Sequence, residues 1–203
     1  MKEIRGDAKN IRALLGGAKY AIDYYQREYR WQTKQVSELL DDLADKFLQS
    51  YDPKHDRTAV ETYGHYFLGS IIISDKDGHK FIIDGQQRLT SLTLLLIQIH
   101  RRLTDLEQKG QLAELIFSQK FGKKSFNLDV PERTACMEAI YSAQPFDENG
   151  QPESVCNILA RYHDIEERFP DHPPYLELAR HRLLDDAVRN VSCDERDSRQ
   201  DSH

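Results

Sequence analysis

The sequence lacks the features that define disulfide-rich and zinc-binding proteins. Its 203 residues include only three cysteines, an odd number, which lie far apart at Cys136, Cys156 and Cys193. We therefore expect neither a disulfide framework nor a zinc site, and we expect free thiols in a cytoplasmic protein. The eight histidines are scattered and no Gly-x-Ser-x-Gly elbow is present, which disfavours the hydrolases built on those motifs.

Long hydrophobic runs and an excess of positive charge are also lacking. The longest apolar segment, Leu89 to Ile99, ends at His100-Arg101-Arg102 and is too short to cross a bilayer, so we expect no contact with a membrane. The polar start of the chain predicts no signal peptide. The net charge of −6 argues against a protein that coats nucleic acid by bulk electrostatics.

The most informative feature is the stretch from Phe81 to Leu96, which reads FIIDGQQRLTSLTLLL. A short apolar strand ends at Asp84-Gly85, and a buried helix follows. A strand that enters a tight turn and a helix leaves backbone N–H groups unpaired, and the helix dipole there favours anions. Arg88 adds a planar donor group suited to phosphate or carboxylate. The pattern predicts an anion site, although Asp84 could instead simply cap the helix.

A second candidate is the segment Tyr25-Gln26-Arg27-Glu28-Tyr29-Arg30-Trp31. Aromatic rings mixed with arginine and glutamine are suited to stacking on a base and to hydrogen bonding with its edge or with phosphate. The alternative is an aromatic latch that holds a loop to the core and is anchored by Trp31, the only tryptophan. The stretch Gly64–Ser70 lacks the lysine of a P-loop and precedes a strand, so it is not one.

The hydrophobic patterns predict an α+β fold with a small sheet-and-helix core. We expect helices at Ile4–Leu15, from Thr33 as the capping residue to Phe47, and at Gln86–Leu106, and an extended segment over Tyr20–Trp31. A hairpin is predicted from Tyr66–Ser74 and His79–Ile83, after a loop over 50–62. Beyond Gly110 the strand signals fade, and 111–118, 131–142, 153–169 and 173–190 look helical. Ser192–His203 reads as a frayed tail.

Three blocks of this sequence together resemble a known family. Tyr20-x-Ile22-x-x-Tyr25-Gln26-Arg27-x-Tyr29-x-Trp31, Tyr66-Phe67-Leu68-Gly69 and Ile83-Asp84-Gly85-Gln86-Gln87-Arg88-Leu89-Thr90 are similar to the N-terminal domain of the GmrSD-type restriction systems. The resemblance covers about residues 4–185 and includes Asn157-Ile158-Leu159-x-x-Tyr162. One departure is Asp23, where the family often has proline.

The resemblance implies a fold related to the ParB/sulfiredoxin-like proteins. The fading of strand signals beyond Gly110 and the polar end of the sequence divide the chain into a core (1–110), a helical subdomain (111–190) and a polar tail (191–203), and the resemblance implies that the core binds nucleotide. The resemblance also implies nucleoside-triphosphate binding and hydrolysis, with Mg²⁺ as cofactor, in anti-phage or modification-dependent restriction. In the family a C-terminal domain of His-Asn-His type cuts DNA, and we expect no such domain in this chain. DNA contact through that domain or a partner is implied, and a homo-oligomer is a further expectation.

The resemblance and the residue pattern suggest one mechanism. Backbone N–H groups at Gly85–Gln87 and the Arg88 guanidinium would hold phosphates, Asp84 would position magnesium or the attacking water, and Gln86 or Gln87 would orient that water. The predicted catalytic residues are Asp84, Gln87 and Arg88, and the predicted nucleotide-binding residues are Tyr25, Gln26, Arg27, Gly85, Gln86 and Thr90. Alternatives are a non-enzymatic DNA-sensing module, a metal-dependent nuclease that uses the same pocket, and an assembly domain.

Overall fold

The computed structural model describes residues 6–22, 28–120, 123–168 and 191–197, and it confirms the predicted α+β fold class. The prediction of a ParB/sulfiredoxin-like core remains a prediction. The strands are β1 Gly6–Asn10, β2 Tyr20–Ile22, β3 Tyr66–Phe67, β4 Ile71–Lys76, β5 His79–Asp84, β6 Phe117–Lys120, β7 Lys123–Phe126, β8 Leu128–Asp129 and β9 Val191–Asp197. The helices are α1 Ile11–Leu15, α2 Thr33–Leu48, α3 Gln86–Arg102, α4 Leu106–Ile116, α5 Pro131–Tyr141 and α6 Glu153–Arg168, with a 3₁₀ helix at Arg57–Thr62.

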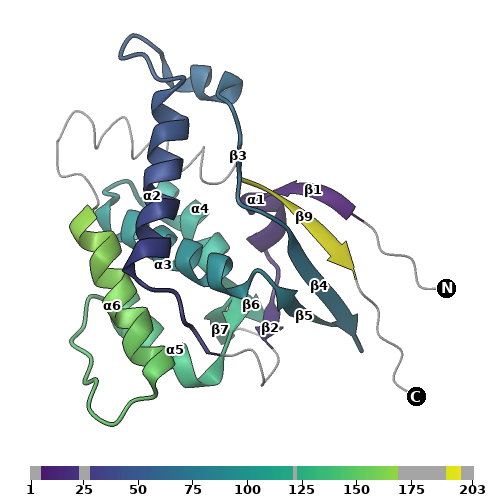
Figure 1. The fold of residues 1–203 in the computed structure, drawn as a ribbon, viewed down its shortest axis with the longest axis vertical. Helices are drawn as coiled ribbons and strands as arrows, with labels where there is room; N and C mark the ends of the chain where they lie inside the picture. The colour runs from purple at the N-terminus through teal and green to yellow at the C-terminus, as the bar shows by residue number, and fades with distance from the viewer. Residues whose placement is uncertain (1–5, 23–27, 121–122, 169–190, 198–203) are drawn as a thin grey trace.

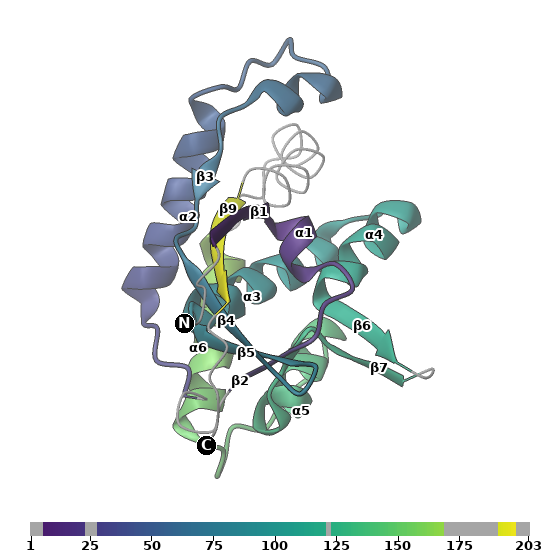
Figure 2. The same ribbon diagram turned by 90° about the vertical axis from the view of Figure 1, so that its right-hand side faces the viewer.

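A mixed sheet forms one side of the molecule (Figure 1). Its strand order is β1-β9-β4-β5-β2-β8, and β3 pairs with β9 outside this path. The predicted hairpin is present as β4 and β5, which pair antiparallel around a tight turn at Asp77-Gly78. The predicted first strand, Tyr66–Ser74, is wrong in its first part, because Tyr66–Phe67 is the separate strand β3, paired with β9, and β4 begins at Ile71. Both turn residues have positive φ, at 53° and 74°, as the favoured two-residue hairpin turn requires. β6 and β7 form a separate two-stranded sheet that projects beside α5 in Figure 2.

Helix α3 occupies the centre of the fold, as its apolar sequence predicts. Every residue from Leu89 to Ile99 is buried, and α3 contacts α4, α5 and α6. In Figure 1 it lies between the sheet and the pair α2 and α6. The helix ends at Arg102, four residues before the predicted end at Leu106, because Asp105 caps α4 by accepting from the Gln108 N–H at 2.8 Å.

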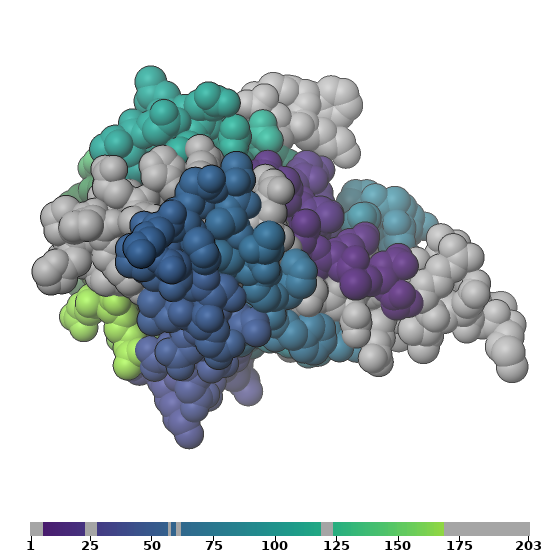
Figure 3. Space-filling view, turned by 90° about the horizontal axis from the view of Figure 1, so that it is seen from above, coloured from purple at the N-terminus to yellow at the C-terminus, as the bar shows by residue number. Residues whose placement is uncertain are grey.

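Helix α2 packs beside α6 (Figure 3) and buries the predicted apolar face. Val36, Leu39, Leu43 and Phe47 are buried, and Leu40 packs against the core. The predicted cap is wrong by one residue: Gln32 is the N-cap, its N–H bonds the Gln35 side chain at 3.0 Å, and Thr33 is the first helical residue. The predicted loop over 50–62 contains the 3₁₀ helix, whose start Asp56 stabilises by accepting from the Thr58 N–H at 2.9 Å.

The amino-terminal helix is shorter than predicted. Only Ile11–Leu15 is helical, whereas Gly6–Asn10 is the strand β1, paired antiparallel with β9. Asn10 caps the short helix by accepting from the Ala13 N–H at 2.8 Å. An amphipathic pattern over few residues suits either structure, and here the pairing with a distant strand decides.

The second half of the chain contains strands that the sequence did not predict. The predicted helix 111–118 is confirmed up to Ile116 as part of α4, which begins at Leu106, but Phe117 and Ser118 belong to the strand β6, which is followed by β7 and β8. Helices α5 and α6 confirm the predictions for 131–142 and 153–169. The prediction for 173–190 lies outside the described residues. The expected frayed tail is wrong for 191–197, which form β9 between β1 and β4.

One hydrophobic cluster joins elements from both predicted parts of the chain. It includes Leu14 of α1, Leu95 of α3, Ile140 of α5 and Ile158 of α6. The division at residue 110 remains a prediction. Among the described residues, none of the helices has the length and apolar character needed to cross a membrane.

Candidate functional site

The turn between β5 and α3 is built as the sequence predicts. Gly85 is the N-cap of α3 with φ of +93°, and a Cβ there would lie 2.3 Å from the Ile71 Cδ1, so only glycine fits this turn. The first helical bond runs from the Leu89 N–H to the Gly85 carbonyl at 3.0 Å. The first turn of α3 contains no acidic residue, and no described side chain caps it. The first N–H groups of this helix therefore have no side-chain acceptor among the described residues.

Arg88 lies beside this turn and holds the chain that precedes β4. Its Nη1 donates to the Leu68 carbonyl at 3.2 Å, and its Nη2 donates to the Ser70 carbonyl at 2.8 Å and to Asp84 Oδ2 at 3.1 Å. Gly69 has φ of +105°, and a Cβ there would lie 1.9 Å from the Arg88 Nη1. The guanidinium thus has a structural role in addition to the phosphate contact that the sequence predicts.

Asp84 is the exposed member of the turn. Its side chain is 61% exposed, whereas that of Arg88 is 24% exposed. Next to them Tyr66 donates to Asp42 Oδ2 at 3.2 Å. Burial and the Asp42 carboxylate raise the pKa of Tyr66 to about 12, against the opposing charge of Arg88. Tyr66 is therefore a protonated donor near neutral pH.

The two glutamines of the turn have different surroundings. Gln87 binds the segment Glu28–Trp31: its Oε1 accepts from the N–H groups of Arg30 at 2.9 Å and Trp31 at 3.3 Å, and its Nε2 donates to the Glu28 carbonyl at 2.7 Å. Gln86 Oε1 is enclosed and has no hydrogen-bond partner in the described part of the chain. Of the two predicted water-orienting amides, Gln87 uses its oxygen for the segment, and Gln86 has an enclosed oxygen without a described partner.

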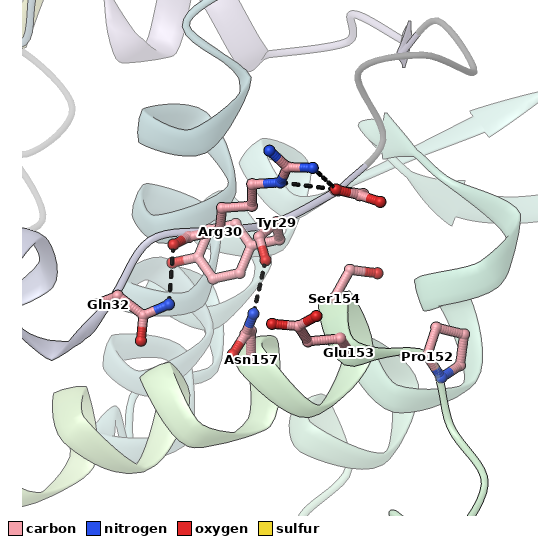
Figure 4. A pocket seen from close by; sticks show the side chains of 8 residues that line it. Tyr29, Arg30, Gln32, Pro152, Glu153, Ser154 and Asn157 are labelled. Carbon is pink, nitrogen blue, oxygen red and sulfur yellow. Dashed lines mark hydrogen bonds and ion pairs between the residues drawn. The ribbon is translucent and has the colours of Figure 1, made fainter.

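The other side of this segment forms one wall of a cavity of about 510 Å³ (Figure 4). Its opposite wall is the start of α6. Asn157 Nδ2 crosses between the walls and donates to the Tyr29 carbonyl at 3.1 Å, and Arg30 pairs with Glu28 along the rim. The lining residues are Glu28, Tyr29, Arg30, Gln32, Pro152, Glu153, Ser154 and Asn157. Residue patterns did not predict this cavity, because its walls are about 120 residues apart in sequence.

Tyr29 lies beneath the cavity wall and is fully buried. Its hydroxyl is 2.7 Å from the Ser91 Oγ, which donates to the Gln87 carbonyl at 3.0 Å. Burial raises the pKa of Tyr29 to about 12, so this ring stays neutral and links the segment to α3. The alternative prediction of an aromatic latch therefore describes Tyr29, together with the partly buried Trp31.

The remaining predicted residues are not all brought to this surface. Thr90 is only 3% exposed, and its hydroxyl is 3.4 Å from the Arg133 Nη1, so it lies behind the turn and away from Asp84. Tyr25, Gln26 and Arg27 lie outside the described residues. The structure brings together Asp84, Gly85, Gln86, Gln87 and Arg88 at one helix terminus, and their ligand-binding roles remain predictions.

A magnesium ion at this turn would receive one protein carboxylate, from Asp84. The described residues contain no group of three or more histidine, cysteine, aspartate or glutamate side chains that could hold a metal. Mg²⁺ commonly binds through one or two carboxylates and completes its six ligands with water and substrate phosphates. The exposed Asp84 carboxylate beside the N-terminus of α3 is compatible with this mode of binding.

Comparison with known proteins agrees with the resemblance found in the sequence. The family model described as "GmrSD restriction endonuclease, N-terminal domain" matches residues 9–201. No curated protein matches the sequence significantly. The family match covers nearly all of the 203 residues and includes each block of the motif. The chain belongs to the family of N-terminal domains of GmrSD restriction endonucleases, which are components of restriction systems.

Proposed function

We propose that this domain binds a nucleoside triphosphate at the Asp84–Arg88 turn and hydrolyses it, within an anti-phage or modification-dependent restriction system. The observation that carries the proposal is the uncapped N-terminus of α3, with the exposed Asp84 carboxylate and the Arg88 guanidinium beside it. Amide donors and a positive dipole bind phosphate, and a carboxylate next to them positions water or a metal. The family assignment supports the biological setting.

Each residue has a distinct role in the proposed reaction. The N–H groups of Gln86 and Gln87 bind phosphate oxygens and stabilise the charge that develops on them. Asp84 orients the attacking water or holds Mg²⁺, which when bound neutralises phosphate charge. Gln86 is proposed to orient the water; its Oε1 has no hydrogen-bond partner among the described residues and is enclosed, so this role requires the side chain to turn toward the site. Arg88 adds positive charge and keeps the Leu68–Ser70 backbone against the site.

The decisive experiment compares wild type with Asp84→Asn. Phosphate release from each of the four nucleoside triphosphates is measured with and without Mg²⁺. Loss of the carboxylate is expected to lower kcat by on the order of 10²–10⁴-fold. The fold should persist, because the Asp84 side chain is mostly exposed and an ion pair with an exposed member contributes little to stability.

Asp45→Asn is the matched control, since Asp45 is an exposed aspartate on α2 outside the turn. Its turnover should equal that of wild type. Wild-type turnover by Asp84→Asn would overturn the proposal. Arg88→Ala should also abolish turnover, but that variant releases the Leu68–Ser70 backbone as well, so its thermal unfolding must be measured beside its activity.

A further inference from the structure

We infer that Gln87 is a positioning residue whose carboxamide holds the segment Glu28–Trp31 against the first turn of α3, and so fixes one wall of the cavity at α6. Three hydrogen bonds of 2.7 to 3.3 Å join this one side chain to the backbone of the segment. They connect residues that are 56 to 59 positions apart in sequence. The catalytic consequence of this role rests on the proposed function, whereas the clamp itself does not.

The hydrogen-bonding capacity of Gln87 is used by the backbone rather than by a reactant. A carboxamide oxygen has two lone pairs, and both are directed to N–H groups here, those of Arg30 and Trp31. The Nε2 group donates to the Glu28 carbonyl. An oxygen with both lone pairs occupied has no site for the attacking water, so Gln87 acts on the reaction through the segment.

In the described part of the chain, the other hydrogen bonds to the backbone of the segment come from Gln32, whose Nε2 donates to the Arg30 carbonyl at 3.1 Å, and from Asn157. The side chains of Glu28 and Arg30 are 67% and 78% exposed and pair with each other, so they do not tie the segment to the core. Asn157 holds the Tyr29 carbonyl from the α6 side. The backbone of residues 28–31 is thus held between Gln87 on α3 and Asn157 on α6, with the Tyr29 ring as the buried anchor.

This arrangement couples the position of the cavity wall to the position of the turn between β5 and α3. The first turn of α3 carries both the proposed phosphate-binding N–H groups and the Gln87 side chain. A displacement of that turn on binding a triphosphate would therefore move the N–H groups of Arg30 and Trp31. Loss of the clamp should chiefly weaken binding, because it leaves Asp84 and the N–H groups in place.

Trp31 reports on the clamp directly. It is the only tryptophan of the chain, and it packs partly buried against the core. Its backbone N–H donates to Gln87 Oε1. In the ligand-free protein, Gln87→Ala should shift the Trp31 emission to longer wavelength and increase its quenching by acrylamide. Hydrogen exchange at the amides of residues 30 and 31 should rise about fivefold, the effect of losing one typical hydrogen bond.

The matched control is Gln111→Ala, which removes an exposed helical glutamine of α4 and should leave both signals unchanged. Gln87→Glu keeps an oxygen that accepts from Arg30 and Trp31 but removes the donor to Glu28, so it should restore part of the wild-type Trp31 signal. If Gln87→Ala does not fold, Gln87→Glu still tests the clamp, because loss of the Glu28 bond alone should raise exchange in the segment.

Kinetics separate positioning from direct catalysis. With the triphosphate that wild type turns over fastest, Gln87→Ala should raise KM about tenfold and change kcat less than threefold, since a mispositioned wall weakens binding. If hydrogen exchange at residues 30 and 31 and acrylamide quenching of Trp31 are the same in Gln87→Ala as in wild type, the proposed role of Gln87 is wrong, whether or not the protein hydrolyses a triphosphate. A fall in kcat with an unchanged Trp31 signal would also overturn it, and would return Gln87 to the chemical step. Absence of hydrolysis by wild type would count against the proposed function alone.

Discussion

Gly69 and Arg88 constrain each other beside the turn between β5 and α3. The guanidinium Nη1 occupies the position of a side chain at residue 69, and the backbone there has φ of +105°. Gly69→Ala must therefore displace Arg88 and force an unfavourable backbone conformation. We expect the free energy of unfolding to fall by about 3 kcal/mol, from strain of about 1–2 kcal/mol and the loss of Arg88 hydrogen bonds. Urea denaturation measures this change.

Gly78→Ala separates backbone strain from the clash. Gly78 also has positive φ, at +74°, but a Cβ there would meet nothing within 4 Å. It should lower the free energy of unfolding by only about 1 kcal/mol. Equal destabilisation by the two variants would show that Arg88 does not depend on the glycine at residue 69.

His100 predicts a dependence of stability on pH. Burial, and then the charges of Lys109 and Lys124, lower its pKa from 6.5 to about 4. Its Nε2 is 3.0 Å from the Tyr141 hydroxyl. Between pH 6.5 and pH 4 the unfolded chain binds a proton that the folded chain excludes, so the free energy of unfolding falls as the pH is lowered. Above pH 6.5 this contribution is fully present, and below pH 4 it changes no further.

The ring is only partly buried, so solvent screening reduces the effect to about 1–2 kcal/mol. His100→Gln should flatten the stability profile between pH 6.5 and pH 4 by that amount, measured by denaturation at a series of pH values. The same substitution at the exposed His65 should leave the slope as in wild type. An unchanged slope in His100→Gln would contradict the lowered pKa.

At the scale of helices and strands, predictions succeeded where a local signal was strong. The apolar run from Leu89 to Ile99 and the Asp84-Gly85 turn located α3 and its first residue, because burial on all sides leaves a continuous hydrophobic sequence. The hairpin predicted from Tyr66–Ser74 and His79–Ile83 located most of β4 and β5. Strand β5 and helix α3 position the turn between them, so the geometry of this turn could be predicted from the sequence.

Predictions failed where distant pairing decides the structure. β1 and β8 become strands through pairing with β9 and β2, and β9 itself reads as a polar tail. The same reason hid the roles of Gln87 and Asn157. Each glutamine of the motif is equally suited by composition to orient water, and only the contact with residues 28–31 distinguishes them. The sequence identified the motif, but it did not assign different roles to Gln86 and Gln87.

At the scale of the whole molecule, the sheet joins the two ends of the described chain. β9 lies between β1 and β4, with residues 192–196 paired to β1 and residues 195–197 paired to β4 (Figure 1). β3 also pairs with β9. Without β9, the described part of the sheet offers β1 no neighbour, and β4 becomes an edge strand. Unpaired edges are less stable and promote association between chains.

A chain that ends at residue 190 is therefore expected to unfold at a lower temperature, by on the order of 10 °C, because several kcal/mol of strand pairing is lost. It should also associate at high concentration, which light scattering detects. A chain that ends at Asp197 retains every strand of the described sheet and should unfold at the same temperature as the full chain. If the shorter chain melts at the full-length temperature and stays dispersed, β9 does not hold the sheet together. If only the chain that ends at residue 190 melts early, β9 is part of the folded domain although its sequence reads as a polar tail. The turn between β5 and α3 then depends on a sheet to which both β1 and β9 contribute.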